Sequence, residues 1–365
     1  MSRVIKWLFK ESSLISLISI FLGLLFGAVI MLIGNYNPIQ AYGALFNKSF
    51  GDLNSIGEVI RQITPLIFTG LSVAFAFRTG LFNIGAEGQF IMGALAASFV
   101  GIQLHLPWYL HIPLAIIAGG LLGGLWGSIA GYLKAVRGVH EVITTIMLNW
   151  IALYLSNFFV KTFLLEKGQM RSKFVDKSAW LSSQGLSEMF GNSRIHYGIV
   201  IALTLAVLFY ILLWKTKQGF ELRAVGFNPE ASQYAGISVN KNIIKAMFIS
   251  GIFAGVGGVC EVLGVFHYQS VNTAFPGYGM MGIAVALIGR NTPLGAILGA
   301  VLLGVLTFGA SGMKFGAGVP EELVNIVIAL IIFFVAASGI VKWLLKLFAK
   351  RNKEVSNRAN PTISK

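Results

Sequence analysis

The sequence predicts an all-α, polytopic membrane protein: a bundle of about ten transmembrane helices with both termini in the cytoplasm. Hydrophobic residues make up 56% of the 365-residue chain and charged residues only 12%, whereas soluble domains carry about 25% charged residues. A soluble fold of this length would expose too much apolar surface to water, and lipid removes that difficulty. The apolar residues also fall into runs of about 20, the length of a helix that crosses a bilayer.

Ten apolar segments meet the hydropathy criterion for spanning helices. They are residues 12–34, 56–77, 81–101, 112–134, 141–162, 197–214, 244–266, 276–290, 293–311 and 322–345. We expect one transmembrane domain over residues 1–346. The first run is too long for the apolar core of a signal peptide, so we interpret it as an uncleaved span. The run 276–290 is short and rich in glycine, so either a spanning or a re-entrant helix fits it.

Basic residues predict the orientation of these spans. With the N-terminus inside, the cytoplasmic segments hold most of the 28 Lys and Arg residues, as the positive-inside rule requires. The 102–111 loop has no Lys or Arg and carries Trp108 and Tyr109, which suits the outer interface. The 163–196 loop is charged, but long loops translocate regardless of charge. An even number of spans then leaves a basic cytoplasmic tail at 347–365.

Several function classes find no support in the sequence. There is no G-x-x-x-x-G-K-[ST] phosphate loop, no H-E-x-x-H and no G-x-S-x-G. A single cysteine, Cys260, excludes a disulfide framework, and the five histidines form no metal-ligand pattern. The net charge of +14 is explained by the cytoplasmic segments, so no nucleic-acid partner is expected. We therefore expect a non-catalytic chain without cofactor or metal, and any ATP hydrolysis must occur on another chain.

Glycine spacing predicts how the spans pack together. The chain has 43 glycines, many of them four residues apart, as in Gly119, Gly123 and Gly127 or in Gly251 and Gly255. Membrane helices approach closely where small residues line the interface, because lipid supplies no hydrophobic force between them. We expect these glycines to make a compact bundle.

Polar residues inside the apolar runs are candidates for a substrate pathway, because a charge or strong dipole in hydrocarbon costs several kcal/mol. The candidates are Asn83, Glu87, Gln89, Glu141, Thr145, Asn149, Trp150 and Glu261. The first three lie among glycines that weaken a helix, and a broken helix there is tolerated only if it lines a cavity. Glu141, Thr145 and Asn149 have i, i+4 spacing and share one helix face. Alternatively, Glu87 or Glu141 forms a structural ion pair with Arg78 or Arg137.

The segment 215–242 is the longest predicted cytoplasmic connection, and it contains signals for a short helix. Asn228 is a good N-cap and Pro229 suits the first helical position. Gly236 ends the helix about two turns later. A short helix lying across the membrane face is a natural docking element, although a solvated connector remains an alternative.

Three stretches carry a family resemblance: GFELRAVGFNPEASQYAGISV in the 215–242 segment, RTGLFNIGAEGQFIMGALAA at 78–97 and VHEVITTIMLNWIALYL at 139–155. They resemble the membrane subunits of ABC importers of the ribose, branched-chain amino acid and nucleoside type. NIGAEGQ followed by TTIMLNWIA is most similar to the permeases of nucleoside importers. The resemblance covers nearly the whole chain and implies that the 215–242 segment holds a coupling helix for the ATPase. The implied coupling residues are Glu221, Arg223, Ala224, Gly226, Asn228, Pro229, Ala231 and Gly236.

The resemblance implies a multi-pass permease subunit in the cell membrane that translocates nucleosides delivered by an extracytoplasmic receptor. The implied partners are a cytoplasmic ABC ATPase, a second permease subunit that is a similar but distinct chain, a substrate-binding lipoprotein and the lipid bilayer. Amides and carboxylates pair with a ribose and a base, and aromatics such as Trp150, Phe82 and Phe275 offer stacking surfaces. Two alternatives remain open: an ABC permease for simple sugars or branched-chain amino acids, and an ion-coupled secondary transporter with intramembrane glutamates as proton carriers.

Overall fold

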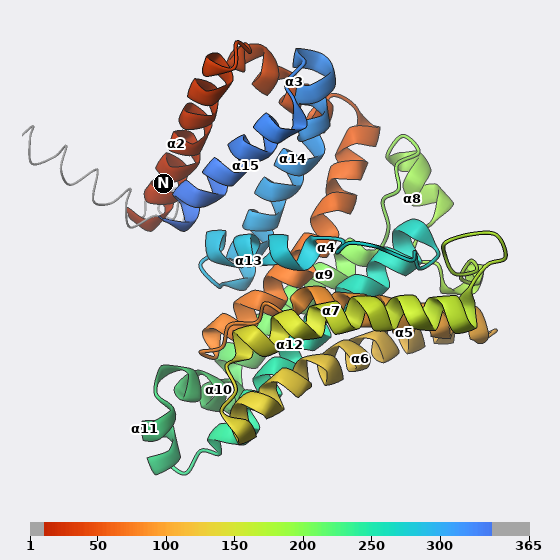
Figure 1. The fold of residues 1–365 in the computed structure, drawn as a ribbon, viewed down its shortest axis with the longest axis vertical. Coiled ribbons are helices and arrows are strands. Elements are labelled where there is room, and N and C mark those ends of the chain that lie inside the picture. Colours follow the sequence, from red (N-terminus) through yellow and green to blue (C-terminus); the bar gives the residue numbers. More distant parts are fainter. Residues whose placement is uncertain (1–10, 338–365) are drawn as a thin grey trace, which may run out of the picture. The chain divides into compact units, whose positions relative to one another are not determined.

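The computed structural model describes residues 11–337, and within that range it is helical without a β-strand, as the sequence predicts (Figure 1). In chain order the helices are α2 (Glu11–Ile33), α3 (Pro38–Phe50), α4 (Leu53–Arg78), α5 (Ala86–Gln103), α6 (Trp108–Arg137), α7 (Glu141–Phe159), α8 (Gln184–Met189), α9 (Gly198–Lys215), α10 (Lys217–Phe227), α11 (Pro229–Tyr234), α12 (Val239–Glu261), α13 (Tyr278–Ile288), α14 (Pro293–Ala317) and α15 (Glu321–Ala336). One π-helical turn extends α7 (Val160–Leu164) and another extends α12 (Val262–Phe266). A 3₁₀ turn covers Lys177–Ala179.

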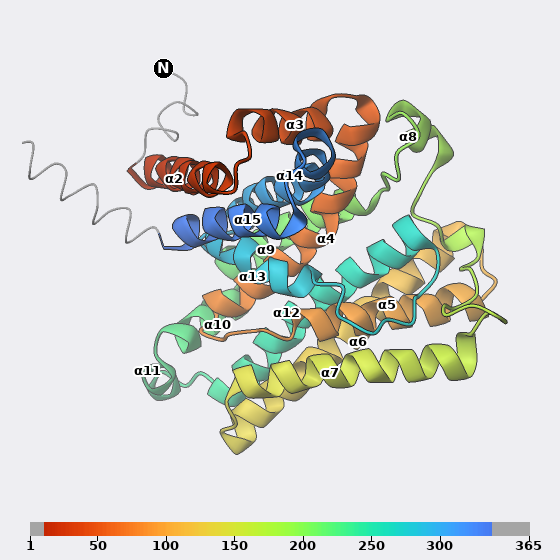
Figure 2. The same ribbon diagram turned by 45° about the horizontal axis from the view of Figure 1, so that its top comes forward.

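The described residues divide into two compact units, 11–46 with 309–337, and Asn47–Phe308. In the first, called the terminal unit, α2 and α15 lie side by side (Figures 1 and 2). A Cβ built at Gly23 would lie 2.6 Å from the Cα of Ile331, so glycine allows this close approach. The Tyr42 hydroxyl donates to the Leu24 carbonyl at 2.7 Å and ties α3 to α2.

The second, called the central unit, is organised around α4, which packs against α12, α13, α9 and α5. Figure 2 shows α5, α6 and α12 running alongside one another. A Cβ at Gly123 would lie 2.6 Å from the Gly251 carbonyl oxygen and 2.7 Å from the Cα of Gly255. Any side chain there would force α6 and α12 apart, so the prediction that these glycines pack helices together is confirmed.

Six of the described helices are long and apolar enough to cross a membrane: α4, α6, α7, α9, α12 and α14, with α7 and α12 including their π-helical turns. The protein is therefore a multi-pass membrane protein. The helix α13 has 11 residues, too few to span about 30 Å of hydrocarbon, which fits the short helix expected at 276–290. The end of the predicted span 322–345 and the tail 347–365 reach beyond the described residues.

One boundary and one additional helix differ from the sequence prediction. The span predicted at 81–101 begins only at Ala86, because the chain leaves helical geometry after Arg78 and Gly80 adopts a φ of 74°. The helix α3 was not predicted, since its polar residues hide the hydropathy signal. Its start is nevertheless encoded locally, because the Asn37 side chain accepts a hydrogen bond from the Ile39 amide at 3.0 Å.

The long 163–196 loop is ordered against the end of α12. The amides of Ser172, Val175 and Leu181 donate to the carbonyls of Gln269, His267 and Leu263 at 2.8, 2.8 and 2.9 Å. These bonds run between two segments about ninety residues apart, and they fix the chain that leads from α12 to α13.

Candidate functional site

A broken helix lies at the centre of the first predicted polar cluster, where residues 79–85 separate α4 from α5. Asn83 is fully buried, and its amide nitrogen donates to Gln89 Oε1 at 2.9 Å and to Ser250 Oγ at 2.7 Å. Its amide oxygen accepts from the Gly85 amide at 2.9 Å. Asn83 and Gln89 therefore form one cluster, as predicted. Their side chains hydrogen-bond to each other, and Asn83 also accepts a backbone amide of the α4–α5 break.

Glu87, the third member of that cluster, points to a different partner. Its carboxylate accepts three backbone N–H groups: Gly277 at 2.7 Å, Gly279 at 2.6 Å and Met280 at 3.2 Å. These amides belong to the first turn of α13 and the residue before it, so Glu87 of α5 caps the N-terminus of another helix. A carboxylate at that position also complements the helix dipole.

The alternative in which Glu87 pairs with Arg78 is wrong. The Arg78 guanidinium donates instead to the carbonyls of Asn291 at 2.7 Å and Arg290 at 2.9 Å, just after α13 ends. Orphan carbonyls at a helix C-terminus attract a cation, which explains the pairing. The two charged residues that flank the α4–α5 break thus hold the two ends of α13.

The predicted shared face on α7 is confirmed, since Glu141, Thr145 and Asn149 are all buried. Asn149 donates to the Ile84 carbonyl at 3.0 Å and accepts from the Gly88 amide at 2.8 Å, so it spans the break from the other side. Glu141 forms an ion pair with Lys134 at 2.6 Å. The expected ion pair is therefore present, but its partner is Lys134, about one helical turn before the expected Arg137 on α6.

Trp150 does not join these buried residues. Its side chain is 42% exposed, and its ring packs against Phe275 with centroids 4.5 Å apart. Trp150 thus contacts Phe275, which lines a cavity. The contact of Trp150 itself with substrate stays a prediction.

That cavity has a volume of about 290 Å³ and lies between α5, the end of α12 and the chain leading to α13. Glu261, the last predicted pathway residue, is in its wall and is 5% exposed. Its Oε1 accepts the Tyr278 hydroxyl at 2.9 Å. Its Oε2 is buried and has no hydrogen-bond partner among the described residues.

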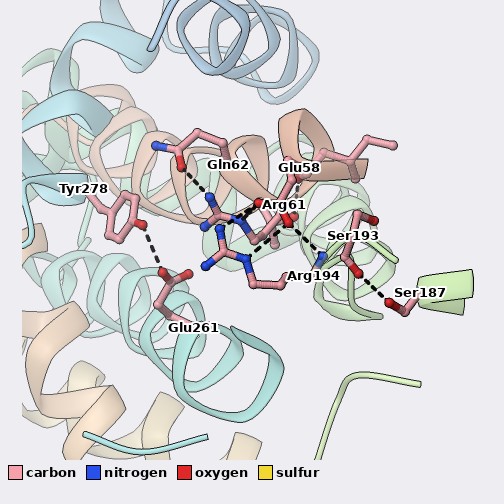
Figure 3. Close-up of polar contacts among 10 residues, drawn as sticks. Glu58, Arg61, Gln62, Ser187, Ser193, Arg194, Glu261 and Tyr278 are labelled. Carbon is pink, nitrogen blue, oxygen red and sulfur yellow. Dashed lines mark hydrogen bonds and ion pairs between the residues drawn. The ribbon is translucent and has the colours of Figure 1, made fainter. Parts of the chain in front are cut away.

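A charged cluster above Glu261 was missed in the sequence analysis (Figure 3). Glu58 Oε2 accepts from Arg61 Nε at 2.7 Å and from Arg194 at 2.9 Å, and Glu58 Oε1 accepts from the Arg194 amide at 2.8 Å. Hydrogen bonding to Glu58 raises the pKa of Arg194, so this loop residue stays charged. Both arginines act electrostatically on Glu261. A signal was present, since Glu58 and Arg61 form an i, i+3 pair inside the apolar run 56–77.

The predicted short helix in the 215–242 segment is confirmed as α11. The Asn228 side chain accepts from the Ala231 amide at 2.9 Å, Pro229 occupies the first turn, and Gly236 follows the helix with a φ of 79°. A second helix, α10, was missed. It carries Glu221, Arg223, Ala224 and Gly226, and it begins where the Thr216 hydroxyl accepts from the Gly219 amide at 3.0 Å.

Two features of α10 and α11 set them apart from a solvated connector. Phe227 is 86% exposed and Tyr234 is 95% exposed, so two aromatic side chains stand free in the part of the chain that the structure describes. The second feature is that Gly226 of α10 contacts the α4–α5 break. A Cβ at Gly226 would lie 2.5 Å from the Thr79 carbonyl carbon, and one at Gly80 would lie 2.7 Å from the Cα of Gly226.

Comparison with known proteins identifies a matching family and several similar relatives. A family model described as "Branched-chain amino acid transport system / permease component" matches residues 55–336. The guanosine ABC transporter permease protein NupP of Bacillus subtilis is 51% identical over 93% of this chain and 97% of its own length. The nucleoside ABC transporter permease protein NupB of Lactococcus lactis is 41% identical over 91% and 93%. The glucose ABC transporter permease protein TsgB13 of Haloferax volcanii is 33% identical over 87% and 85%. No solved structure matches the chain.

Proposed function

This chain belongs to the family of permease components of branched-chain amino acid transport systems, and we propose that it is the membrane-spanning subunit of an ATP-driven nucleoside importer. Nucleosides are supported as the substrate class by the identity of 51% and 41%, over nine-tenths of the chain, to permeases named for guanosine and nucleosides. The chain moves substrate and does not hydrolyse ATP.

In this proposal α10 and α11 receive the ATPase. Support comes from the exposed rings of Phe227 and Tyr234, because aromatic side chains are typical anchors of protein interfaces. Support also comes from the glycine contact between Gly226 and Gly80, through which a displacement of α10 meets the α4–α5 break directly. The break in turn leads to Glu87 and the N-terminus of α13. ATP-driven movement of α10 would thereby reach the helices around the cavity.

The remaining parts of the assembly follow from family membership. We propose a cytoplasmic ABC ATPase, a second permease subunit that is a similar but distinct chain, and a substrate-binding lipoprotein at the outer face. We also propose the finer topology, with about ten membrane segments and both termini in the cytoplasm. Cysteines introduced in the 102–111 loop and in the 215–242 segment should then react with an impermeant thiol reagent from opposite sides of sealed vesicles.

A co-purification experiment tests the coupling proposal. A tagged chain, purified from cells that express the whole proposed transporter, should bring down an ATPase. The double variant Phe227→Ala with Tyr234→Ala should lose that ATPase, while Ile143→Ala, an exposed apolar residue on α7, should retain it. Retention of the ATPase by the double variant would contradict docking on α10 and α11.

The glucose relative supports a second candidate substrate class, because it is 33% identical over most of both chains. A competition assay distinguishes nucleosides from sugars as the substrate. Excess unlabelled guanosine or adenosine should suppress uptake of labelled guanosine by membrane vesicles containing the full assembly, and excess glucose, ribose or leucine should not. Suppression by glucose at the concentration at which guanosine acts would favour the sugar permease.

A further inference from the structure

We propose that the cavity beside Glu261 holds the base of a purine nucleoside and that the Glu261 carboxylate accepts hydrogen bonds from adjacent N–H groups of a guanine-type base. This inference rests on the proposed function and narrows it in two ways. It assigns the substrate to one place in the chain, and it names the edge of the base that the protein recognises.

The carboxylate is the first argument. Glu261 is 5% exposed, yet its Oε2 atom has no donor among residues 11–337. A buried acceptor left unpaired is costly, and nearly all such groups in proteins have a partner. Because Glu261 lies in the cavity wall, a base in the cavity would meet this carboxylate once the buried Oε2 atom turns toward it.

The neighbouring arginines leave this acceptor open. Arg61 and Arg194 act electrostatically on Glu261, and in Figure 3 the dashed line from Glu261 goes to Tyr278 and not to either arginine. Their short ion pairs, however, go to Glu58, at 2.7 Å and 2.9 Å. The arginines therefore supply positive potential near the carboxylate without filling the hydrogen-bonding position of Oε2.

The walls of the cavity are the second argument. Five aromatic residues line it: Phe90, Phe266, Tyr268, Phe275 and Tyr278. Flat bases stack on such rings, whereas a sugar or an aliphatic amino acid gains less from them. The volume of about 290 Å³ lies just below the roughly 300–1,000 Å³ typical of small-molecule sites. That size suits a base with its ribose.

Amide side chains complete the polar lining. Gln269 and Asn272 line the same cavity, and within the described range their side-chain amides make no hydrogen bond, since the bonds of both residues run through the backbone. Each amide offers both a donor and an acceptor. Ribose hydroxyls and the acceptors of a purine ring can use either.

The geometry of a carboxylate favours guanine over adenine. Guanine presents N1–H and an N2 amino group side by side, and two parallel donors match two carboxylate oxygens. Oε1 accepts the Tyr278 hydroxyl, and its second lone pair remains for one of these donors. Adenine presents the N1 lone pair beside its N6 amino group, so it would turn an acceptor toward the carboxylate. A glutamine amide, with one donor and one acceptor, could accept only one of these two guanine donors, and it would match the N1 and N6 groups of adenine.

Equilibrium binding tests the assignment. The full permease–ATPase complex, purified without its receptor, is titrated with labelled guanosine and labelled adenosine. Glu261→Gln should weaken guanosine binding by about tenfold or more, the value of a hydrogen bond to a charged group, and should leave adenosine binding equal or tighter. Glu188→Gln, an exposed change on α8, should alter neither. Tyr278→Phe keeps the ring and the carboxylate, so the preference for guanosine should persist.

Three results would overturn the assignment of the guanine base to Glu261. An equal loss of guanosine and adenosine binding in Glu261→Gln, or no change in either, would overturn it. So would the absence of measurable guanosine binding by a wild-type complex that transports guanosine. If Glu261→Gln yields no monodisperse complex, Glu261→Asp takes its place and should bind more weakly while keeping the preference for guanosine. ATP-dependent guanosine uptake by the wild-type complex separates these failures from failure of the proposed function.

Discussion

Replacing Glu87 with glutamine should destabilise the N-terminus of α13. The wild-type carboxylate accepts the amides of Gly277, Gly279 and Met280 at 2.7, 2.6 and 3.2 Å. A glutamine side chain has one carbonyl oxygen, so the amides of Gly279 and Met280 can keep an acceptor while that of Gly277 faces an NH₂ group. A hydrogen bond to a charged group contributes about 1.5–3 kcal/mol. We therefore expect a loss of about 2 kcal/mol, and a loss about twofold larger for Glu87→Ala.

Thermal unfolding of the detergent-purified protein measures this loss. In a domain of 150–250 residues, each kcal/mol lowers Tm by roughly 2–4 °C, so Glu87→Gln should lower Tm by several degrees and Glu87→Ala by more. The control Glu188→Gln should stay within about 0.5 kcal/mol of wild type. Uptake should also change in Glu87→Gln while membrane insertion stays intact.

The cap on α13 is refuted if Glu87→Gln and Glu87→Ala both unfold at the wild-type temperature. An equal decrease in both would also contradict it, because only alanine removes all three acceptors. Unchanged uptake kinetics in Glu87→Gln would remove this residue from the pathway that links α10 to α13.

Three further predictions concern other parts of the central unit. Gly226→Val should force α10 away from Thr79 and abolish ATP-dependent transport while ATPase binding persists, as measured by uptake and co-purification; normal uptake would refute the role of this contact. Asn228→Ala should cost about 1 kcal/mol of α11 stability and weaken ATPase binding, whereas Asn228→Asp should preserve both. Burial lowers the pKa of His196 from 6.5 to about 4. The unfolded chain therefore takes up a proton between these values that the folded protein does not, so stability present above pH 6.5 should fall by about 3 kcal/mol as pH decreases to 4. Measured as Tm against pH, that decrease should be absent in His196→Gln.

Local sequence signals predicted several parts of this structure well. Asn228, Pro229 and Gly236 specify the two ends of α11 through their own backbone preferences, without help from distant residues. Likewise, the i, i+4 spacing of Glu141 and Asn149 places them on one buried face, whatever that face contacts. Features of this kind depend on neighbours in the chain, and they can be inferred from one sequence.

The partners of the buried polar groups could not be predicted in the same way. Glu87 caps a helix that begins about 190 residues later, and no spacing rule connects the two positions. The nearest arginine in the sequence, Arg78, offered a plausible ion pair, but backbone carbonyls after α13 bind it instead. Nor could the sequence indicate that Oε2 of Glu261 lacks a donor among residues 11–337, since this depends on where Arg61 and Arg194 direct their hydrogen bonds.

In the proposed function, ATP hydrolysis on a partner chain moves nucleosides through this permease, and uptake by proteoliposomes containing the full assembly and its receptor tests this most directly. Labelled guanosine should accumulate only with ATP on the ATPase side, should not accumulate with a non-hydrolysable analogue, and should be insensitive to a protonophore. Accumulation without ATP that a protonophore abolishes would contradict the claim. The intramembrane glutamates Glu87, Glu141 and Glu261 would then become candidates for proton carriers in a secondary transporter.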